Sequence, residues 1–258
     1  MNKEKLYFIT DLDRTIIHSK NKGFRCVEVM GKKEITYMTD LAYEKLQDIL
    51  KEENLVFVPC TMRNIKQTLR VDFIREYNPK IIICTNGAEI YIDGELDKEW
   101  DKKIKKIVNH TELIKNIEYL KDIAEKNKEI EVLEVRNIED FYITVKCKNE
   151  DFAKKFYALI KDSFKKELLV INIEAKIFII DENIDKIHAV QYLEEKLNIK
   201  NLITSGDSVV DEKFTTRGSC ILPKHSSFKH KEAIITDKNK IESTEEILDF
   251  VKNKLSYI

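Results

Sequence analysis

Two carboxylates spaced two residues apart, Asp11 and Asp13, follow directly on the apolar run Leu6–Thr10. Such a run of β-branched, aromatic and aliphatic residues predicts a strand buried on both faces of a parallel sheet. Carboxylates this close repel each other, and they are costly to bury unless a cation compensates them. The pair therefore predicts a metal-binding edge; a capping turn, with Asp11 solvated and Asp13 as the cap, is the alternative.

A second acid pair, Asp207 and Asp211, follows a further apolar run at Asn201–Thr204. The carboxyl ends of parallel strands meet at one edge of a sheet, so the four carboxylates are expected to converge there. Oxygen ligands without a nearby His or Cys favour Mg²⁺ over zinc or copper. The alternative is a pair of acids stabilised by the dipole at a helix N-terminus.

Two further side chains fit a phosphate site. Thr61 follows the apolar run Leu55–Pro59, where its hydroxyl and backbone amide could bind a phosphoryl oxygen or simply cap a helix. Lys186 falls in the first turn of a helix expected over Asp185–Leu197, where a cation opposes the helix dipole. This placement is explained if an anion binds there; a solvated surface lysine is the alternative.

These motifs match a family in their order along the chain. D-L-D-R-T at 11–15, Thr61, Lys186 and G-D-S-x-x-D at 206–211 resemble the haloacid-dehalogenase-like (HAD) phosphohydrolases. T-N-G-A at 85–88, followed by an expected αββαββ insertion, is similar to their branch with a large cap of the C2 type. That branch includes sucrose-phosphate phosphatase, mannosyl-phosphoglycerate phosphatase and phosphomannomutase. Two positions depart from the pattern: Arg14 stands where many relatives carry Gly, and C-T-M-R lacks the Gly common after the threonine.

The resemblance implies a role for each matched residue. Asp11 would be the nucleophile that forms an aspartyl phosphate, and Asp13 would protonate the leaving group and then activate water. Asp11, the Asp13 backbone carbonyl and Asp207 would hold Mg²⁺, with Asp211 in support. Thr61 and Lys186 would neutralise phosphoryl oxygens. Candidate substrate contacts are Arg14, Arg63, Asn86, Arg136 and Lys176.

The hydrophobic pattern predicts an α/β fold, a doubly wound Rossmann-like parallel sheet with an inserted α+β segment. Buried strands at Leu6–Thr10, Leu55–Pro59, Lys80–Cys84 and Asn201–Thr204 assign residues 1–88 and 182–258 to the core domain. Two alternating runs around Gly31 predict a hairpin over the first acid pair. From residue 89 to 181 the order helix, strand, strand occurs twice, which predicts antiparallel pairing in a separate cap domain.

Composition limits the class of protein. Hydrophobic residues make up 43% of the 258, enough for a large core, and 45 Lys and Arg against 46 Asp and Glu give no basic footprint for nucleic acid or membrane. Five cysteines without a C-x-x-C favour free thiols in a reducing cytosol. We expect a cytoplasmic protein, a monomer or homodimer, whose partner is a small phosphorylated molecule.

Four functions are compatible with these residues. The first is a Mg²⁺-dependent phosphomonoesterase that acts on a sugar or polyol phosphate. A phosphomutase would use the same nucleophile and retain a bisphosphate for reorientation. A receiver-like module, regulated by phosphorylation, also combines an acid pair, a hydroxyl and a lysine, but it carries its acceptor aspartate on a later strand. A non-catalytic scaffold is the least compatible, because every motif position retains a reactive residue.

Overall fold

The apolar run before the first acid pair forms β1 (Leu6–Thr10) of a five-stranded parallel sheet in the computed structural model, which describes residues 4–258. The strand order is β14-β13-β12-β1-β4. The other members are β4 (Leu55–Pro59), β12 (Asn201–Ser205), β13 (Ser219–Leu222) and β14 (Ile234–Ile235). Because β1 pairs in parallel with both β12 and β4, the residues that follow these three strands leave the sheet at the same edge.

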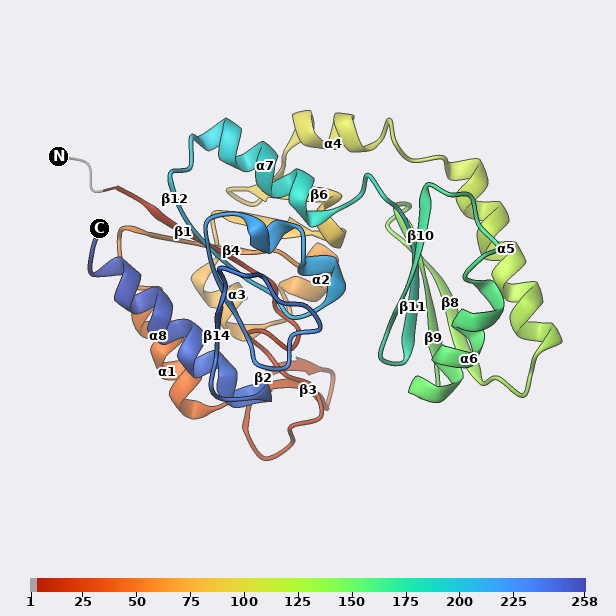
Figure 1. Cartoon of the computed structure of the whole chain (residues 1–258), viewed down its shortest axis with the longest axis horizontal. Coiled ribbons are helices and arrows are strands. Elements are labelled where there is room, and N and C mark those ends of the chain that lie inside the picture. Colours follow the sequence, from red (N-terminus) through yellow and green to blue (C-terminus); the bar gives the residue numbers. More distant parts are fainter. Residues whose placement is uncertain (1–3) are drawn as a thin grey trace. The chain divides into compact units, whose positions relative to one another are not determined.

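Among the described residues, five α-helices belong to the unit that contains this sheet, which comprises residues 4–97 and 185–258. They are α1 (Asp40–Ile49), α2 (Ile65–Thr68), α3 (Asp72–Tyr77), α7 (Lys186–Leu197) and α8 (Ser243–Leu255). Thr39 caps α1 by accepting a hydrogen bond from the Ala42 amide. Helices α1 and α8 lie side by side and bury their apolar residues in one core with Phe8 and Phe57 (Figure 1).

The expected hairpin is present as β2 (Arg25–Met30) and β3 (Lys33–Met38). The strand expected at Lys80–Cys84 differs from its prediction. It forms β5 (Ile81–Cys84) and pairs antiparallel with β6 (Glu89–Ile92), which in turn pairs with β7 (Glu95–Leu96). A single parallel bridge, Cys60 to Ile83, connects β5 to the residue after β4.

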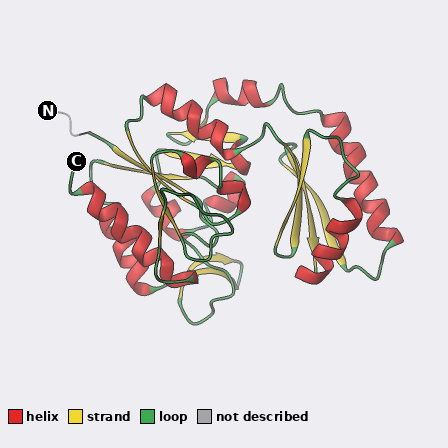
Figure 2. Ribbon diagram, viewed as in Figure 1, coloured by secondary structure: helices red, strands yellow, loops and turns green. Residues whose placement is uncertain are grey.

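The remaining residues, Lys98–Ile184, form a second compact unit. Its elements are α4 (Lys98–Ile104), α5 (His110–Lys126), β8 (Val132–Ile138), β9 (Tyr142–Cys147), α6 (Glu150–Ile160), β10 (Leu168–Ile173) and β11 (Lys176–Asp181). Its antiparallel sheet has the order β10-β11-β9-β8. Figure 2 shows the strands of this sheet in yellow, with red helices beside them. The expected insertion began at residue 89, whereas the unit begins at Lys98, because β6 and β7 extend the sheet of β5.

The second unit has its own core, in which Leu120 of α5 and Phe156 of α6 pack with Ile143 and Ile179 from the sheet. Within residues 4–258, none of the helices combines the length and the apolar composition that crossing a bilayer requires. All five cysteines lie in this described range, and their thiols are free.

Candidate active site

The acids that follow β1 and β12 meet at one edge of the parallel sheet. Asp11, Asp207 and Asp211 are buried, and one carboxylate oxygen from each lies within 4.8 Å of the others. The capping-turn alternative required a solvated Asp11 and is therefore wrong. Three carboxylates in this arrangement provide the all-oxygen donor set that Mg²⁺ prefers, so the residues fit the metal that the sequence predicts.

Lys186 joins two of these acids. Its ammonium donates to Asp11 Oδ1 and to Asp211 Oδ1, both at 2.7 Å, and its side chain is completely buried. The alternative of a solvated surface lysine is therefore wrong. Burial opposes the charge on Lys186, yet the two carboxylates raise its pKa above the ordinary value. Burial raises the pKa of Asp11 well above its ordinary value, and the lysine offsets only part of that effect.

Asp207 pairs with a cation from the loop after β1. Arg14 Nε donates to Asp207 Oδ2 at 2.6 Å, and a second nitrogen of the guanidinium contacts the same oxygen. Burial, together with the nearby carboxylate of Asp211, raises the pKa of Asp207 to about 7, although Arg14 acts in the opposite direction. Two cations thus face three carboxylates, and a divalent ion would relieve the remaining repulsion.

Asp211 organises the loop that carries Asp207. Its Oδ2 accepts hydrogen bonds from the backbone amides of Asp207 (3.1 Å) and Ser208 (2.9 Å). Gly206 makes this contact possible, because a Cβ at that position would lie 2.4 Å from the Asp211 Cβ. The alternative reading of Asp207 and Asp211 as ordinary helix-terminal acids does not account for their burial beside Asp11 and Lys186.

Thr61 is buried directly after β4, and its backbone amide donates to Ile83 O (2.9 Å). Its hydroxyl accepts the Arg63 amide at 3.2 Å, and its carbonyl accepts the Asn86 amide at 3.1 Å. Asn86 therefore lies beside the loop that carries Thr61, in the turn after β5. Gly87 brings the same turn against α7, because its φ is +89° and a Cβ would lie 2.8 Å from Asp185 O.

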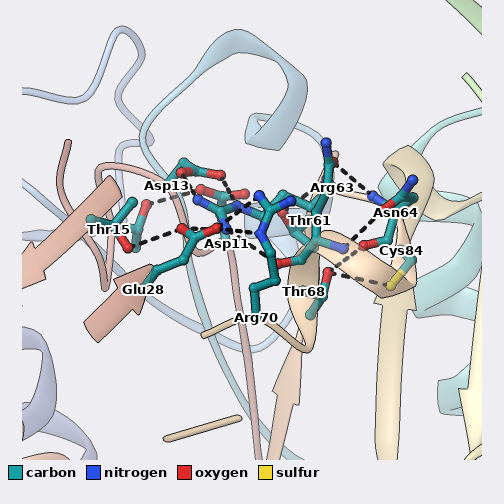
Figure 3. Close-up of polar contacts among 12 residues, drawn as sticks. Asp11, Asp13, Thr15, Glu28, Thr61, Arg63, Asn64, Thr68, Arg70 and Cys84 are labelled. Carbon is teal, nitrogen blue, oxygen red and sulfur yellow. Dashed lines mark hydrogen bonds and ion pairs between the residues drawn. The ribbon is translucent and has the colours of Figure 1, made fainter. Parts of the chain in front are cut away.

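The side chain of Asp13 does not join the three buried acids in this cluster. Arg63 donates two hydrogen bonds to the Asp13 carboxylate, from Nε to Oδ2 at 2.6 Å and from Nη2 to Oδ1 at 2.7 Å. The third nitrogen of the same guanidinium donates to Glu28 at 2.8 Å, so Arg63 bridges two carboxylates (Figure 3). Arg63 was predicted as a substrate contact; in the structure its observed partner is the expected acid–base residue.

Glu28 and its second partner, Arg70, were not singled out from the sequence. Regular alternation along β2 would place Val27 and Glu28 on opposite faces of the hairpin. The register instead shifts on both sides of Glu28, and both side chains are buried. A bulge of this kind re-aims a side chain, and nothing in the residue types of the hairpin indicates it.

The two remaining candidate substrate contacts, Arg136 and Lys176, lie on strands of the second unit's sheet. Arg136 is in β8, where it forms an ion pair with Glu134, and Lys176 begins β11 with an exposed side chain. Both belong to the second unit, and their role in binding a substrate stays a prediction.

One family model matches the sequence over residues 4–222, and its description is sucrose-6F-phosphate phosphohydrolase. The match covers most of the chain and includes every motif of the buried cluster. A search of curated protein sequences found no match.

Solved structures give the same fold at low identity. A sucrose-phosphatase from Synechocystis sp. PCC6803, in complex with sucrose and phosphate, has a TM-score of 0.62 and 15% identity, covering 96% of this chain and 98% of that one. A putative HAD/COF-like hydrolase from Plasmodium vivax has a TM-score of 0.68 and 12% identity, with 97% and 96% covered. The C-terminal domain of trehalose-6-phosphate phosphatase from C. albicans has a TM-score of 0.62 and 14% identity, with 97% and 93% covered.

Proposed function

We propose, from the premise that this chain belongs to the sucrose-6F-phosphate phosphohydrolase family of phosphatases, that it hydrolyses a sugar phosphate through an aspartyl-phosphate intermediate. The observation that carries the proposal is the buried lysine, Lys186, which contacts Asp11 and Asp211 where β1 and β12 end. A buried cation beside a carboxylate fits a site that must hold a phosphoryl group next to a nucleophile.

The reaction divides into two steps. Asp11 attacks phosphorus and forms the phosphorus–oxygen bond of an acyl phosphate, while the bond to the sugar oxygen breaks and Asp13 gives that oxygen a proton. In the second step Asp13 removes a proton from water, which attacks phosphorus and releases inorganic phosphate, so that Asp11 returns to its carboxylate form. Lys186 and Thr61 neutralise the phosphoryl oxygens that accumulate charge.

Mg²⁺ is the metal that we propose for the acidic cluster. Asp11 and Asp207 would hold it with the backbone carbonyl of Asp13, and Asp211 would support the loop that presents Asp207. The metal, when bound, supplies positive charge that offsets the repulsion between the carboxylates and the phosphate. We further propose that the second unit, Lys98–Ile184, acts as the cap and that Arg136 and Lys176 contribute to the choice of sugar.

A substrate screen tests the proposal. The purified protein should release inorganic phosphate from p-nitrophenyl phosphate and from a sugar phosphate such as sucrose 6-phosphate, and EDTA should abolish the release until Mg²⁺ is restored. Formation of an isomeric sugar phosphate without phosphate release would instead identify a mutase. Absence of both products across a broad panel of phosphorylated metabolites would contradict the proposal.

A further inference from the structure

Glu28 is a buried carboxylate whose hydrogen-bonding capacity is filled by three side chains. Its side chain has no solvent exposure. Oε1 accepts Arg70 Nε at 3.0 Å and Nη2 at 2.8 Å, while Oε2 accepts Arg63 Nη1 at 2.8 Å and the Thr36 hydroxyl at 3.1 Å. Burying an anion is costly unless cations and hydrogen bonds compensate it, and here both do. The Glu28 side chain is therefore fixed in position.

Arg63 connects the fixed Glu28 side chain to Asp13 in the candidate active site. Its guanidinium is planar, so the hydrogen bonds that Nη1 donates to Glu28 Oε2 at 2.8 Å and to Gln67 O at 3.4 Å set the direction in which Nε and Nη2 point, and the contact with Glu28 is the shorter. Those two nitrogens form the bidentate contact with Asp13. The backbone of Arg63 is held as well, because its amide donates to Thr61 Oγ1 and its carbonyl accepts the Thr85 amide at 2.8 Å.

Asp13 is the member of the site that needs such support. Its side chain is 48% exposed, and it stands in the loop after β1. A residue that must protonate a leaving oxygen loses much of its effect when it is displaced by about 1 Å. Arg63 holds this carboxylate through two side-chain hydrogen bonds, and Glu28 accepts a third hydrogen bond from the same guanidinium.

We propose that Glu28 is a positioning residue: it anchors Arg63 so that the guanidinium holds the Asp13 carboxylate in the orientation required for proton transfer. This inference rests on the proposed phosphatase reaction and adds a function for the hairpin. The bulge in β2 turns Glu28 inward, so the hairpin contributes to the chemistry through Arg63 without contacting the reacting atoms.

The leaving group distinguishes positioning from a purely structural role. A sugar oxygen must be protonated as it leaves, whereas p-nitrophenolate leaves readily without a proton. We therefore expect Glu28→Gln to lower kcat/KM about 100-fold for the sugar phosphate and less than about threefold for p-nitrophenyl phosphate. The ratio kcat/KM reports the first step, in which this leaving group departs.

Two further variants complete the experiment. Glu245→Gln is the matched control, because Glu245 is also a buried carboxylate of the first unit, accepting Thr39 Oγ1 at 2.7 Å and pairing with Lys238. It should lower Tm and leave both kcat/KM values unchanged. Arg63→Lys retains the charge but loses the planar fork, and it should reproduce the leaving-group-dependent loss even if Glu28→Gln fails to fold.

Each outcome separates the inference from the proposed function. A wild-type protein that hydrolyses no compound of the phosphorylated panel refutes the phosphatase reaction itself. An active wild type with unchanged Glu28→Gln and Arg63→Lys variants overturns the positioning role. Equal losses on both compounds would also overturn it, because they would place Arg63 on the phosphoryl group. A further variant, Arg63→Ala, removes the guanidinium altogether. Adding Glu28→Gln to Arg63→Ala should cause no further loss of kcat/KM.

Discussion

The two compact units differ in how deeply their ion pairs are buried. In the first unit Asp11, Glu28 and Lys186 are buried and make short contacts with oppositely charged groups. In the second unit the ion pairs are exposed, as between Lys126 and Asp122 or between Lys148 and Glu131. Both units come from a chain with nearly equal numbers of acids and bases, so overall composition does not cause the difference.

The difference indicates which ion pairs matter most for the stability of the fold. Surface pairs contribute roughly 0–1 kcal/mol each to the free energy of unfolding, and their loss is readily tolerated. Buried charges are costly unless every partner is in place, so they persist where their chemistry is needed. The second unit resembles an ordinary amphipathic α+β layer, whereas the first concentrates desolvated charge at the edge of its parallel sheet.

The largest contrast is expected from replacing one carboxylate in each unit. Asp11→Asn removes the proposed nucleophile and should lower kcat roughly 10³-fold or more. The same chemical change at Asp122, an exposed partner of Lys126 in α5, should leave kcat unchanged. Steady-state assays with p-nitrophenyl phosphate measure both. Activity that survives in folded Asp11→Asn would falsify the assignment of the nucleophile.

Two lysine variants, one in each unit, compare how much a buried and an exposed ion pair contribute to the free energy of unfolding. Lys186→Met leaves Asp11 and Asp211 buried without their shared cation, so the free energy of unfolding should fall by about 3 kcal/mol. Lys148→Met removes an exposed partner of Glu131 and should cost less than about 1 kcal/mol. Chemical denaturation in the absence of Mg²⁺ gives both values. Equal losses would mean that burial does not distinguish the two lysines.

Arg14 offers a smaller effect within the first unit. Its guanidinium contacts Asp207 Oδ2, an oxygen of the proposed metal cluster, and its backbone φ is +66°. Arg14→Gly should remove this competing cation and a left-handed non-glycine residue at once, tightening Mg²⁺ binding by about tenfold. Isothermal titration calorimetry measures the affinity directly. Arg25→Ala, which alters an exposed guanidinium, is the control; unchanged binding in Arg14→Gly would exclude competition at Asp207.

The smallest effect at neutral pH is expected for acid stability, because this effect develops only as pH falls. His18 is buried against Thr244, and burial, with His225 and Arg14 adding to it and Asp13 opposing it, lowers the pKa of His18 to about 3. Because the unfolded histidine takes up a proton near pH 6.5 and the folded one does not, folding loses stability as pH falls from 6.5 towards 3. The loss should approach about 1.4 kcal/mol per pH unit in this range.

His18→Gln should flatten this part of the curve of unfolding free energy against pH. His110→Gln, which changes an exposed histidine at the start of α5, should follow the wild type. Chemical denaturation at several values between pH 6.5 and 4 supplies the comparison. Parallel curves for the wild type and His18→Gln would show that His18 does not cause the acid sensitivity.

The sequence was sufficient to predict the parts of the fold that depend on local pattern. The run at Leu55–Pro59 became β4 with the same bounds, and the two runs around Gly31 became the β2–β3 hairpin. The convergence of Asp11 with Asp207 followed from a general property of parallel sheets, namely that their carboxyl ends share an edge. These predictions needed no knowledge of side-chain packing.

What the sequence did not predict depends on tertiary geometry. Strands β6 and β7 form an antiparallel sheet with β5, although the apolar run at Lys80–Cys84 predicts a strand of the parallel sheet. The inward turn of Glu28 comes from a bulge that its residue types do not indicate. The hydrogen-bond partners of Arg14 and Arg63 likewise could not be predicted from the sequence, because long side chains can turn towards several acids in the same site.

The close approach at Gly206 has a consequence for how this sequence can vary. Any side chain there would collide with Asp211, and that residue holds both the loop amides and the lysine. A neutral, inert substitution that never touches a substrate should therefore be as damaging as losing an acid. In a survey of all single replacements, intolerance should extend to this position, which has no functional group of its own.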